Sequence, residues 1–162
     1  SPEMKSTGEA IGYDSSLTRA LYKALRSSGM DVANYGTLFA TIADVDKEKA
    51  LPLIRRFYNL AFNIEGTKGT AEFLRQHGIR TRYRAKLSEG SDEIFTALRQ
   101  GHINYVINTM DISQGDSTRD GYEIRRCAVE NNVSIFTSLE TVQVLLDVLE
   151  EITLGVSTID AE

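Results

Sequence analysis

Cysteine, proline, histidine and tryptophan are scarce in this sequence, and each shortage excludes something. Its 162 residues include one cysteine, two prolines, two histidines and no tryptophan. The single cysteine, Cys127, rules out an internal disulfide and fits a reducing compartment, so we expect a cytoplasmic protein. Because Cys127 falls in a helix-like run, we interpret it as a small half-buried thiol rather than a nucleophile.

Long apolar runs and an excess of basic residues are missing as well. No apolar stretch approaches the roughly 20 residues of a membrane-spanning helix, and nothing resembles a signal peptide. The formal net charge of -5 argues against a general nucleic-acid surface. We therefore expect neither a membrane nor nucleic acid as a partner. The apolar content of 41% is ordinary for a globular domain, and the length suffices for one sizeable core.

The residue sets that usually carry catalysis are not assembled anywhere in the sequence. His77 stands at a predicted helix end and His102 in a predicted turn, and we expect neither to be catalytic. No group of histidine, cysteine and acidic residues has metal-ligand spacing. No serine has an obvious histidine–aspartate relay. We therefore expect no catalytic residue, metal or cofactor within this chain.

From Tyr35 onward, strand-like and helix-like segments alternate five times. Strands are predicted at residues 36–42, 61–64, 79–85, 103–108 and 133–136. Helices are predicted at residues 44–60 (with an awkward Pro52 that delays or kinks it), 69–76, 91–99 and 120–131, and a last helix opens with a capping box at residues 137–140. This alternation predicts a three-layer, doubly wound α/β fold whose five-stranded, mainly parallel sheet carries helices on both faces.

Residues 1–34 differ from the rest of the chain. A polar lead-in is followed by a helix pattern that Asp14-Ser15-Ser16 can cap and that ends at Ser27-Ser28-Gly29. One helix after an irregular lead-in cannot form a core of its own. We interpret this piece either as the tail of a preceding domain or as an element docked on the main one.

The loop Gly66-Thr67-Lys68-Gly69-Thr70 runs from the second predicted strand into a helix. Its glycines allow close approach of the backbone, and the helix start offers free N–H groups and a positive dipole end. Taken alone, it is as well explained by a tight turn with a capping threonine. Lys47, Lys86 and Asn108 follow neighbouring strands, however, and parallel strands bind ligands beyond their carboxyl ends. Together these residues predict a phosphate site.

Alternation also places Arg80, Arg82, Arg84 and Lys86 on one face of the third predicted strand. We expect Arg80 and Arg82 to be solvated and to protect a sheet edge, whereas Lys86 lies where the ligand should be. After the fourth strand, three aspartates can cap a helix or hold a ribose hydroxyl: Asp111, Asp116 and Asp120.

The sequence resembles the C-terminal part of the large chain of carbamoyl-phosphate synthetase, and the resemblance covers essentially the whole of it. Pro2-Glu3-Met4-Lys5-Ser6-Thr7-Gly8-Glu9 is similar to the end of its second ATP-grasp unit. The sequence from about Tyr35 is similar to its methylglyoxal-synthase-like allosteric domain. Lys47, the loop at 66–70, Lys86, Asn108-Thr109 and residues 120–126 keep the family's order and spacing. The resemblance implies that 1–34 is a tail and linker and 35–162 the regulatory domain.

The resemblance also implies a function. The regulatory domain would bind a nucleotide monophosphate such as UMP or IMP and would not itself be an enzyme. The parent would be a glutamine-hydrolysing ligase of pyrimidine and arginine biosynthesis that uses ATP with Mg or Mn and pairs with a glutaminase small chain. Carried over to this sequence, the phosphate ligands would be Lys47, Thr67, Thr70, Lys86, Asn108, Thr109 and Thr41. The contacts to the base and ribose would be Leu87, Ile94, Asp120 and Ile124. Met110 departs from a threonine of some members, and the stretch from 109 to 120 is longer.

Two other functions are open at this point. The fold is shared with methylglyoxal synthase, a lyase that acts on dihydroxyacetone phosphate and needs a carboxylate after strand three and a histidine after strand four. Asp92 or Glu93 supplies a carboxylate, but no histidine stands near either loop, so the acid–base pair is incomplete. The chain is alternatively a purely structural module for self-association, since related domains form oligomers.

Overall fold

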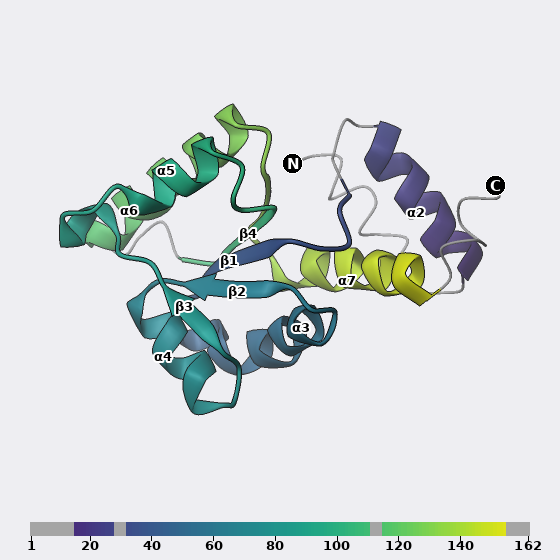
Figure 1. Cartoon of the computed structure of the whole chain (residues 1–162), viewed down its shortest axis with the longest axis horizontal. Helices are drawn as coiled ribbons and strands as arrows, with labels where there is room; N and C mark the ends of the chain where they lie inside the picture. Colours follow the sequence, from purple (N-terminus) through teal and green to yellow (C-terminus); the bar gives the residue numbers. More distant parts are fainter. Residues whose placement is uncertain (1–14, 28–31, 111–114, 155–162) are drawn as a thin grey trace.

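The computed structural model describes residues 15–27, 32–110 and 115–154 of the chain (Figure 1). The predicted features that lie outside these residues are the segment at 2–9, the capping Asp14, the helix stop at Ser28-Gly29 and Asp111. The strands are β1 (Thr37–Thr41), β2 (Asn63–Gly66), β3 (Thr81–Tyr83), β4 (Tyr105–Asn108) and β5 (Ser134–Phe136). The helices are α2 (Ser15–Ser27), α3 (Lys47–Asn59), α4 (Lys68–Gln76), α5 (Glu93–Arg99), α6 (Gly115–Glu130) and α7 (Leu139–Leu154), with short 3-10 turns η1 (Asp44–Asp46) and η2 (Leu87–Glu89).

The five strands form one sheet in the order β3-β2-β1-β4-β5, and every neighbouring pair is parallel. β1 is central, pairing Ala40 with Gly66 of β2 and with Ile107 of β4. The predicted α/β fold with a parallel five-stranded sheet is therefore confirmed. Because all strands run the same way, the loops after β1, β2, β3 and β4 meet at one edge, which we call the carboxyl edge.

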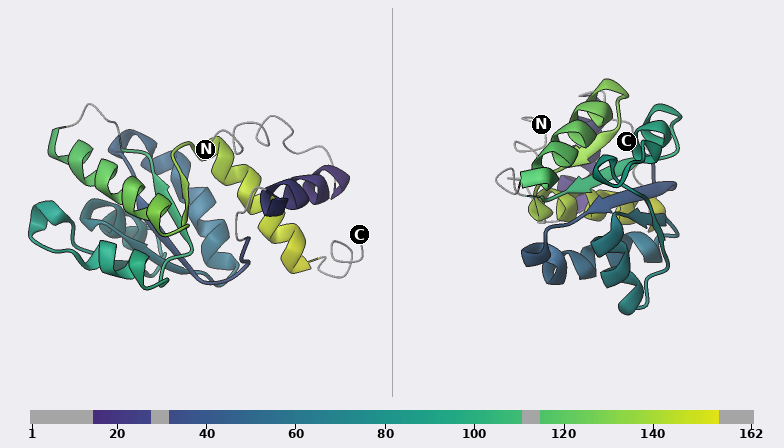
Figure 2. Two further views of the ribbon diagram at one scale, coloured as in Figure 1. Left: turned by 90° about the horizontal axis from the view of Figure 1, so that it is seen from above. Right: turned by 90° about the vertical axis from the view of Figure 1, so that its left-hand side faces the viewer.

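Helices cover both faces of the sheet. α5 and α6 lie over one face, and α3 and α4 lie over the other (Figures 1 and 2). α7 packs beside α3 on the second face, where the Arg56 guanidinium of α3 donates to Glu150 (2.6 and 2.9 Å) and to Asp147 (2.9 Å) of α7. These contacts raise the pKa of Arg56, with the hydrogen bonds to Glu150 as the main cause.

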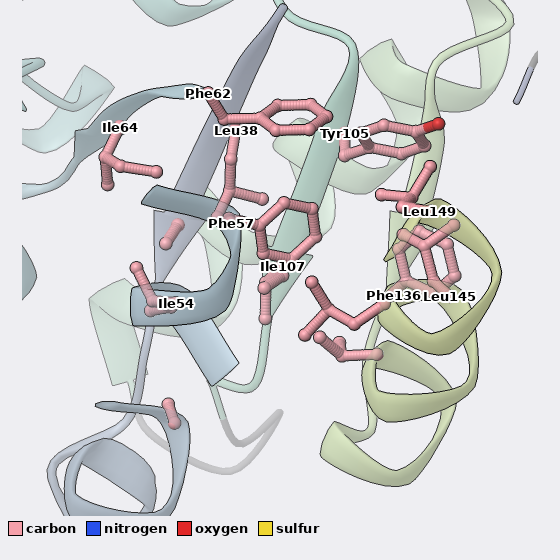
Figure 3. Close-up of a cluster of buried hydrophobic side chains, with 14 of the residues drawn as sticks. Leu38, Ile54, Phe57, Phe62, Ile64, Tyr105, Ile107, Phe136, Leu145 and Leu149 are labelled. Atoms are coloured by element: carbon pink, nitrogen blue, oxygen red, sulfur yellow. The ribbon is translucent and has the colours of Figure 1, made fainter. Parts of the chain in front are cut away.

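The apolar core falls into two clusters, one on each face of the sheet. The larger cluster joins α3, α4 and α7 to Leu38 and Ala40 of β1. Figure 3 shows its aromatic centre, where the rings of Phe57 and Phe62 meet edge to face with centroids 5.2 Å apart and Tyr105 lies against both. The smaller cluster joins α5 and α6 to Phe39 and Val106. The alternation Leu38, Phe39, Ala40 across two buried faces is the pattern of a central parallel strand.

Several element bounds differ from those predicted. β2 begins at Asn63 rather than residue 61, because α3 ends in a left-handed residue, Ala61, with φ of 70°. The N–H of Phe62 then donates to the carbonyl of Phe57 (3.1 Å), which closes the helix in a Schellman-like turn. α3 begins at Lys47 and continues through Pro52. α6 begins at Gly115, upstream of the predicted start at 120, and so includes Asp116.

α2 packs against α7 and the larger cluster (Figure 1). Tyr22 of α2 and Val32 after it contact that cluster, and the Tyr105 hydroxyl donates to the carbonyl of Ala33 (2.6 Å). Tyr105 is the first residue of β4, so this contact lies at the edge opposite the carboxyl edge. Ser15–Ser27 is thus docked on the sheet domain, as one of the two interpretations expected, and the boundary at residue 34 stays a prediction.

Candidate functional site

The candidate site is built where β1 and β2 end and α4 begins. Gly66 closes β2 in very close contact with β1: a Cβ added to it would lie 3.0 Å from the carbonyl oxygen of Ala40 and 3.3 Å from the Thr70 methyl. A larger residue would push these apart. Thr67 precedes α4 in extended conformation with φ of -69°, and the helix then starts at Lys68. The first N–H groups of α4 therefore face the carboxyl edge, where they favour an anion.

Three threonines predicted as phosphate ligands are brought together here, and a fourth joins them from β4. The Thr67 hydroxyl donates to the Thr41 hydroxyl (3.2 Å). The N–H of Ile42 donates to Thr70 Oγ1 (3.0 Å), and the N–H of Ala43 donates to Thr109 Oγ1 (3.0 Å). Because Thr70 and Thr109 accept in these bonds, each hydroxyl keeps its own proton to donate to a ligand.

Asn108 ends β4 and is almost fully buried, with 1% of its surface exposed. Its Oδ1 accepts from the N–H of Met110 (3.1 Å), and its Nδ2 donates to the carbonyl of Gly121 in α6 (3.2 Å). A Cβ on Gly121 would lie 3.3 Å from that same Nδ2, so the glycine lets α6 approach the strand. Both bonds fix the amide orientation and leave the second N–H of Nδ2 for another acceptor.

The two predicted cations, Lys47 and Lys86, lie on different elements of the edge. Lys47 begins α3, and its Nζ lies 3.2 Å from where a Cβ of Gly69 would be, which places the ammonium at the first turn of α4. It forms an ion pair with Asp44 of η1. The hydrogen bond and the charge of Lys47 lower the pKa of Asp44.

Lys86 stands just before η2, in a loop held by Glu89. The Tyr83 hydroxyl donates to Glu89 Oε2 (2.7 Å), and the N–H of Lys86 donates to Glu89 Oε1 (2.9 Å). These two bonds, the one from Tyr83 first, lower the pKa of Glu89, and the charges of Lys86 and Lys68 add to the effect. The same contact raises the pKa of Tyr83. The loop that carries Lys86 is therefore braced from β3.

The residues predicted to contact the base and ribose differ in their accessibility. Asp120 of α6 is 5% exposed, and its Oδ2 accepts from the Ser88 hydroxyl (2.8 Å), which joins η2 to α6. Ile94 and Ile124 are buried at 1% exposure each, whereas Leu87 is 40% exposed. Leu87 thus offers an open apolar surface, whereas the two isoleucines are packed in the smaller core cluster.

Two cavities border the edge. One of about 190 Å³ opens between α5 and α6, where Leu87, Phe95 and Cys127 line it. A larger one of about 690 Å³ lies between α3 and the start of α7, with Thr109 on its wall.

Sequence reasoning missed a buried ion pair next to the loop at residues 66–70. Arg84 Nε donates to Glu65 Oε1 (2.7 Å) and Nη2 to Oε2 (3.4 Å), with Nη1 3.7 Å from Glu93 of α5. Glu65 and Arg84 are only 7% and 9% exposed, unlike the solvated Arg80 and Arg82 of the same run. The available signal was Glu65 itself, since a carboxylate inside a buried strand needs a charged partner.

Among the residues that the structure describes, groups suited to catalysis are not gathered at the carboxyl edge. His77 follows α4 and contacts Phe73, while His102 precedes β4, so both histidines lie toward the opposite edge. Asp92 is exposed at the start of α5. Cys127 is 7% exposed, more buried than predicted, and burial raises the pKa of its thiol. Across residues 15–27, 32–110 and 115–154, no group of three or more potential metal ligands is assembled. Within the same residues, no helix has the length and apolarity to cross a bilayer.

Comparison with known families identifies the domain that carries this site. The family model of the MGS-like domain matches residues 49–137, which is more than half of the 162-residue chain. The match runs from the first turn of α3 to the residue after β5, and it includes Thr67, Thr70, Lys86 and Asn108. With its parallel five-stranded sheet and this match, the chain belongs to the MGS-like domain family.

Proposed function

We propose that this chain is a regulatory domain that binds a nucleotide monophosphate, UMP or IMP, at the carboxyl edge of its sheet. The phosphate contacts Lys47, Thr67, Thr70, Lys86 and Asn108, with Thr41 and Thr109 beside them. Leu87 contacts the base, Asp120 faces the ribose, and Ile94 and Ile124 support that wall. MGS-like membership alone fits either a regulatory domain or a lyase, so the proposal depends on the chemistry of the edge.

The observation that carries the proposal is the set of hydrogen-bond donors left over at the edge. Thr70 and Thr109 accept backbone N–H groups and keep their hydroxyl protons, and Asn108 keeps one amide proton. The start of α4 and the ammonium of Lys47 lie beside them. Among the described residues, these neutral donors and the Lys47 ammonium lie together without an acid–base pair, which suits an anion that is held and not transformed.

The larger protein proposed around this domain is the large chain of carbamoyl-phosphate synthetase. In that setting residues 1–34 end the second ATP-grasp unit, and residues 35–162 form the regulatory domain. Catalysis with ATP and Mg or Mn, and the pairing with a glutaminase small chain, belong to the parent in the cytoplasm. Binding regulates such a parent only if the effector prefers one of its two states. Self-association of the domain is a further proposal.

Calorimetric titration of the chain with UMP, IMP and inorganic phosphate tests the proposed site. We expect saturable binding of a nucleotide, and a loss of about ten- to a hundredfold in affinity for Lys47→Ala and for Lys86→Ala, because each removes a charge-assisted contact. Lys23→Ala is the matched control, since Lys23 lies exposed on α2, away from the carboxyl edge. Unchanged affinity in both site variants would refute the assignment, and no binding of any ligand would refute the function.

The lyase is the second candidate, and one observation favours it: Asp92 stands exposed in the loop after β3, where the enzyme needs a carboxylate. Incubation with dihydroxyacetone phosphate and an assay for methylglyoxal separates the two functions. A regulatory domain produces no methylglyoxal above the rate of the uncatalysed reaction. Turnover that Asp92→Asn abolishes would establish the lyase instead.

A further inference from the structure

Lys47 is nearly enclosed, and its charge is already neutralised by one carboxylate. Its side chain is 16% exposed, while the side chain of its partner Asp44 is 92% exposed. The ammonium therefore points into the carboxyl edge, toward the first turn of α4, and Asp44 approaches it from the solvent side. A phosphate that enters from solvent must meet Lys47 in the presence of this carboxylate.

The side chain of Asp44 makes few other contacts among the described residues. Its main chain forms η1, and the N–H of Lys47 donates to its carbonyl. The hydrogen bond to Lys47 Nζ is the one side-chain bond that the described residues show for Asp44. An ion pair of this exposure adds little to stability, so its main effect falls on the ammonium. The neighbouring Asp46 lies in the same turn and carries the same charge, but forms no side-chain capping bond.

We propose that Asp44 is an internal competitor for the phosphate site, which holds Lys47 until a phosphate replaces it. This inference depends on the proposed function, because it concerns the affinity of that same site. A bound phosphate takes over the hydrogen bond of Lys47 Nζ, and the Asp44 carboxylate swings into water, which its exposure allows. Asp44 therefore lowers the affinity of the site for any phosphate ligand and leaves the discrimination between nucleotide bases unchanged.

The size of the effect follows from the ion pair that must be broken. Releasing Lys47 from a charged hydrogen bond of this exposure weakens phosphate binding by about three- to tenfold. Asp44→Asn removes the carboxylate charge and keeps the shape of the side chain. We therefore expect inorganic phosphate and UMP each to bind about three- to tenfold more tightly, with a gain that shrinks as salt is added.

Calorimetry on four variants of the chain tests the inference, with inorganic phosphate and UMP as the ligands. Asp46→Asn is the matched control and is expected to change affinity less than twofold, because it removes the same charge without breaking the bond to Lys47. In a Lys47→Ala background, adding Asp44→Asn should increase affinity by less than half of the gain that it gives in the parent chain, since no ammonium remains to be released. Melting temperatures within 2 degrees of the parent, on the order expected for exposed sites, exclude an effect through folding.

The outcomes separate the inference from the function it depends on. Equal or weaker binding by Asp44→Asn, with the parent chain still bound and Lys47→Ala still impaired, overturns the competitor and leaves the site standing. Equal gains for Asp44→Asn and Asp46→Asn also overturn it, because they show general charge rather than competition. Binding by Asp44→Asn alone, with none by the parent chain, supports a strong competitor. No binding by either chain overturns both proposals.

Discussion

The buried pair between Glu65 and Arg84 permits a prediction about stability that the structure makes quantitative. Arg84→Met removes the guanidinium that lies 2.7 Å from Glu65 Oε1 and keeps most of the apolar stem. The carboxylate is then left buried, with about a tenth of its side chain exposed. Removing one partner of a buried ion pair typically costs about 3–5 kcal/mol, because the remaining charge is uncompensated.

A second route limits this cost. The orphaned carboxyl group can take up a proton, and an ordinary glutamate titrates near pH 4.3, so holding one protonated at pH 7 costs about 3.7 kcal/mol, at about 1.4 kcal/mol per pH unit. The variant should therefore lose about 3–4 kcal/mol at pH 7. The folded variant binds more protons than its unfolded chain above pH 4.3, so part of the loss is recovered as the pH falls toward 5.

Urea denaturation at pH 7 measures the loss of stability, and the same experiment at pH 5.5 measures how much of that loss is recovered. Arg82→Met is the control, because Arg82 pairs in register with Glu65 on the neighbouring strand but is exposed; it should change stability by less than about 0.5 kcal/mol. The double variant Glu65→Leu/Arg84→Met should lie within about 1 kcal/mol of the parent, since no charge remains buried. A loss below 1 kcal/mol for Arg84→Met, or an equal loss for Arg82→Met, would refute this reasoning.

Three smaller predictions concern single residues. Ala61→Gly should stabilise the chain by about 0.5–1 kcal/mol, seen as a higher urea midpoint, because Ala61 holds a φ of 70° that favours glycine; a lower midpoint would contradict it. Cys127 should react with a disulfide reagent far more slowly than a free thiol at pH 7, since burial raises its pKa, and denaturant should restore the rate. Tyr83→Phe should raise the pKa of Glu89, followed by NMR titration, because the Tyr83 hydroxyl is the first cause of its lowering. Glu89 stabilises the fold at a pH above its pKa in the unfolded chain, and this contribution is lost as the pH falls through its lower pKa in the folded chain. Because the Tyr83→Phe variant has a higher folded pKa, it should lose the contribution of Glu89 at a higher pH. An unchanged pKa of Glu89 would contradict this prediction.

The grouping of residues at the carboxyl edge could be predicted from the sequence, because a parallel topology fixes which loops lie together. Once the strands are parallel, whatever follows them must meet at one edge, and so Thr41, Thr67 and Asn108 come together although far apart in the chain. No tertiary contact had to be guessed. The same logic placed Lys47 next to the start of α4.

Features that depend on one particular side-chain contact or backbone conformation could not be predicted from the sequence. Arg84 looks like its neighbours Arg80 and Arg82 in a period-two run, and the strand register aligns Glu65 with Arg82. Only the side-chain contact between Arg84 and Glu65 shows which arginine is buried. The start of β2 depends on Ala61, a residue with no turn signal of its own, adopting a left-handed conformation. α6 begins at Gly115, among polar residues whose pattern has no apolar period to announce a helix.

The separation of the core into two clusters would give the proposed effector a mechanical role. Lys47 and Thr70 belong to helices on the larger cluster, whereas Ser88 and Asp120 tie the loop of Lys86 to the α5–α6 layer. A nucleotide bound as proposed would contact both layers and hold them together, so amides of α5 and α6 should exchange more slowly when it is bound. α2 packs on α7 at the far end of the larger cluster (Figure 1). An effector that stiffens the α3–α7 layer, bound as proposed, would therefore reach α2 through that layer and not through the α5–α6 layer.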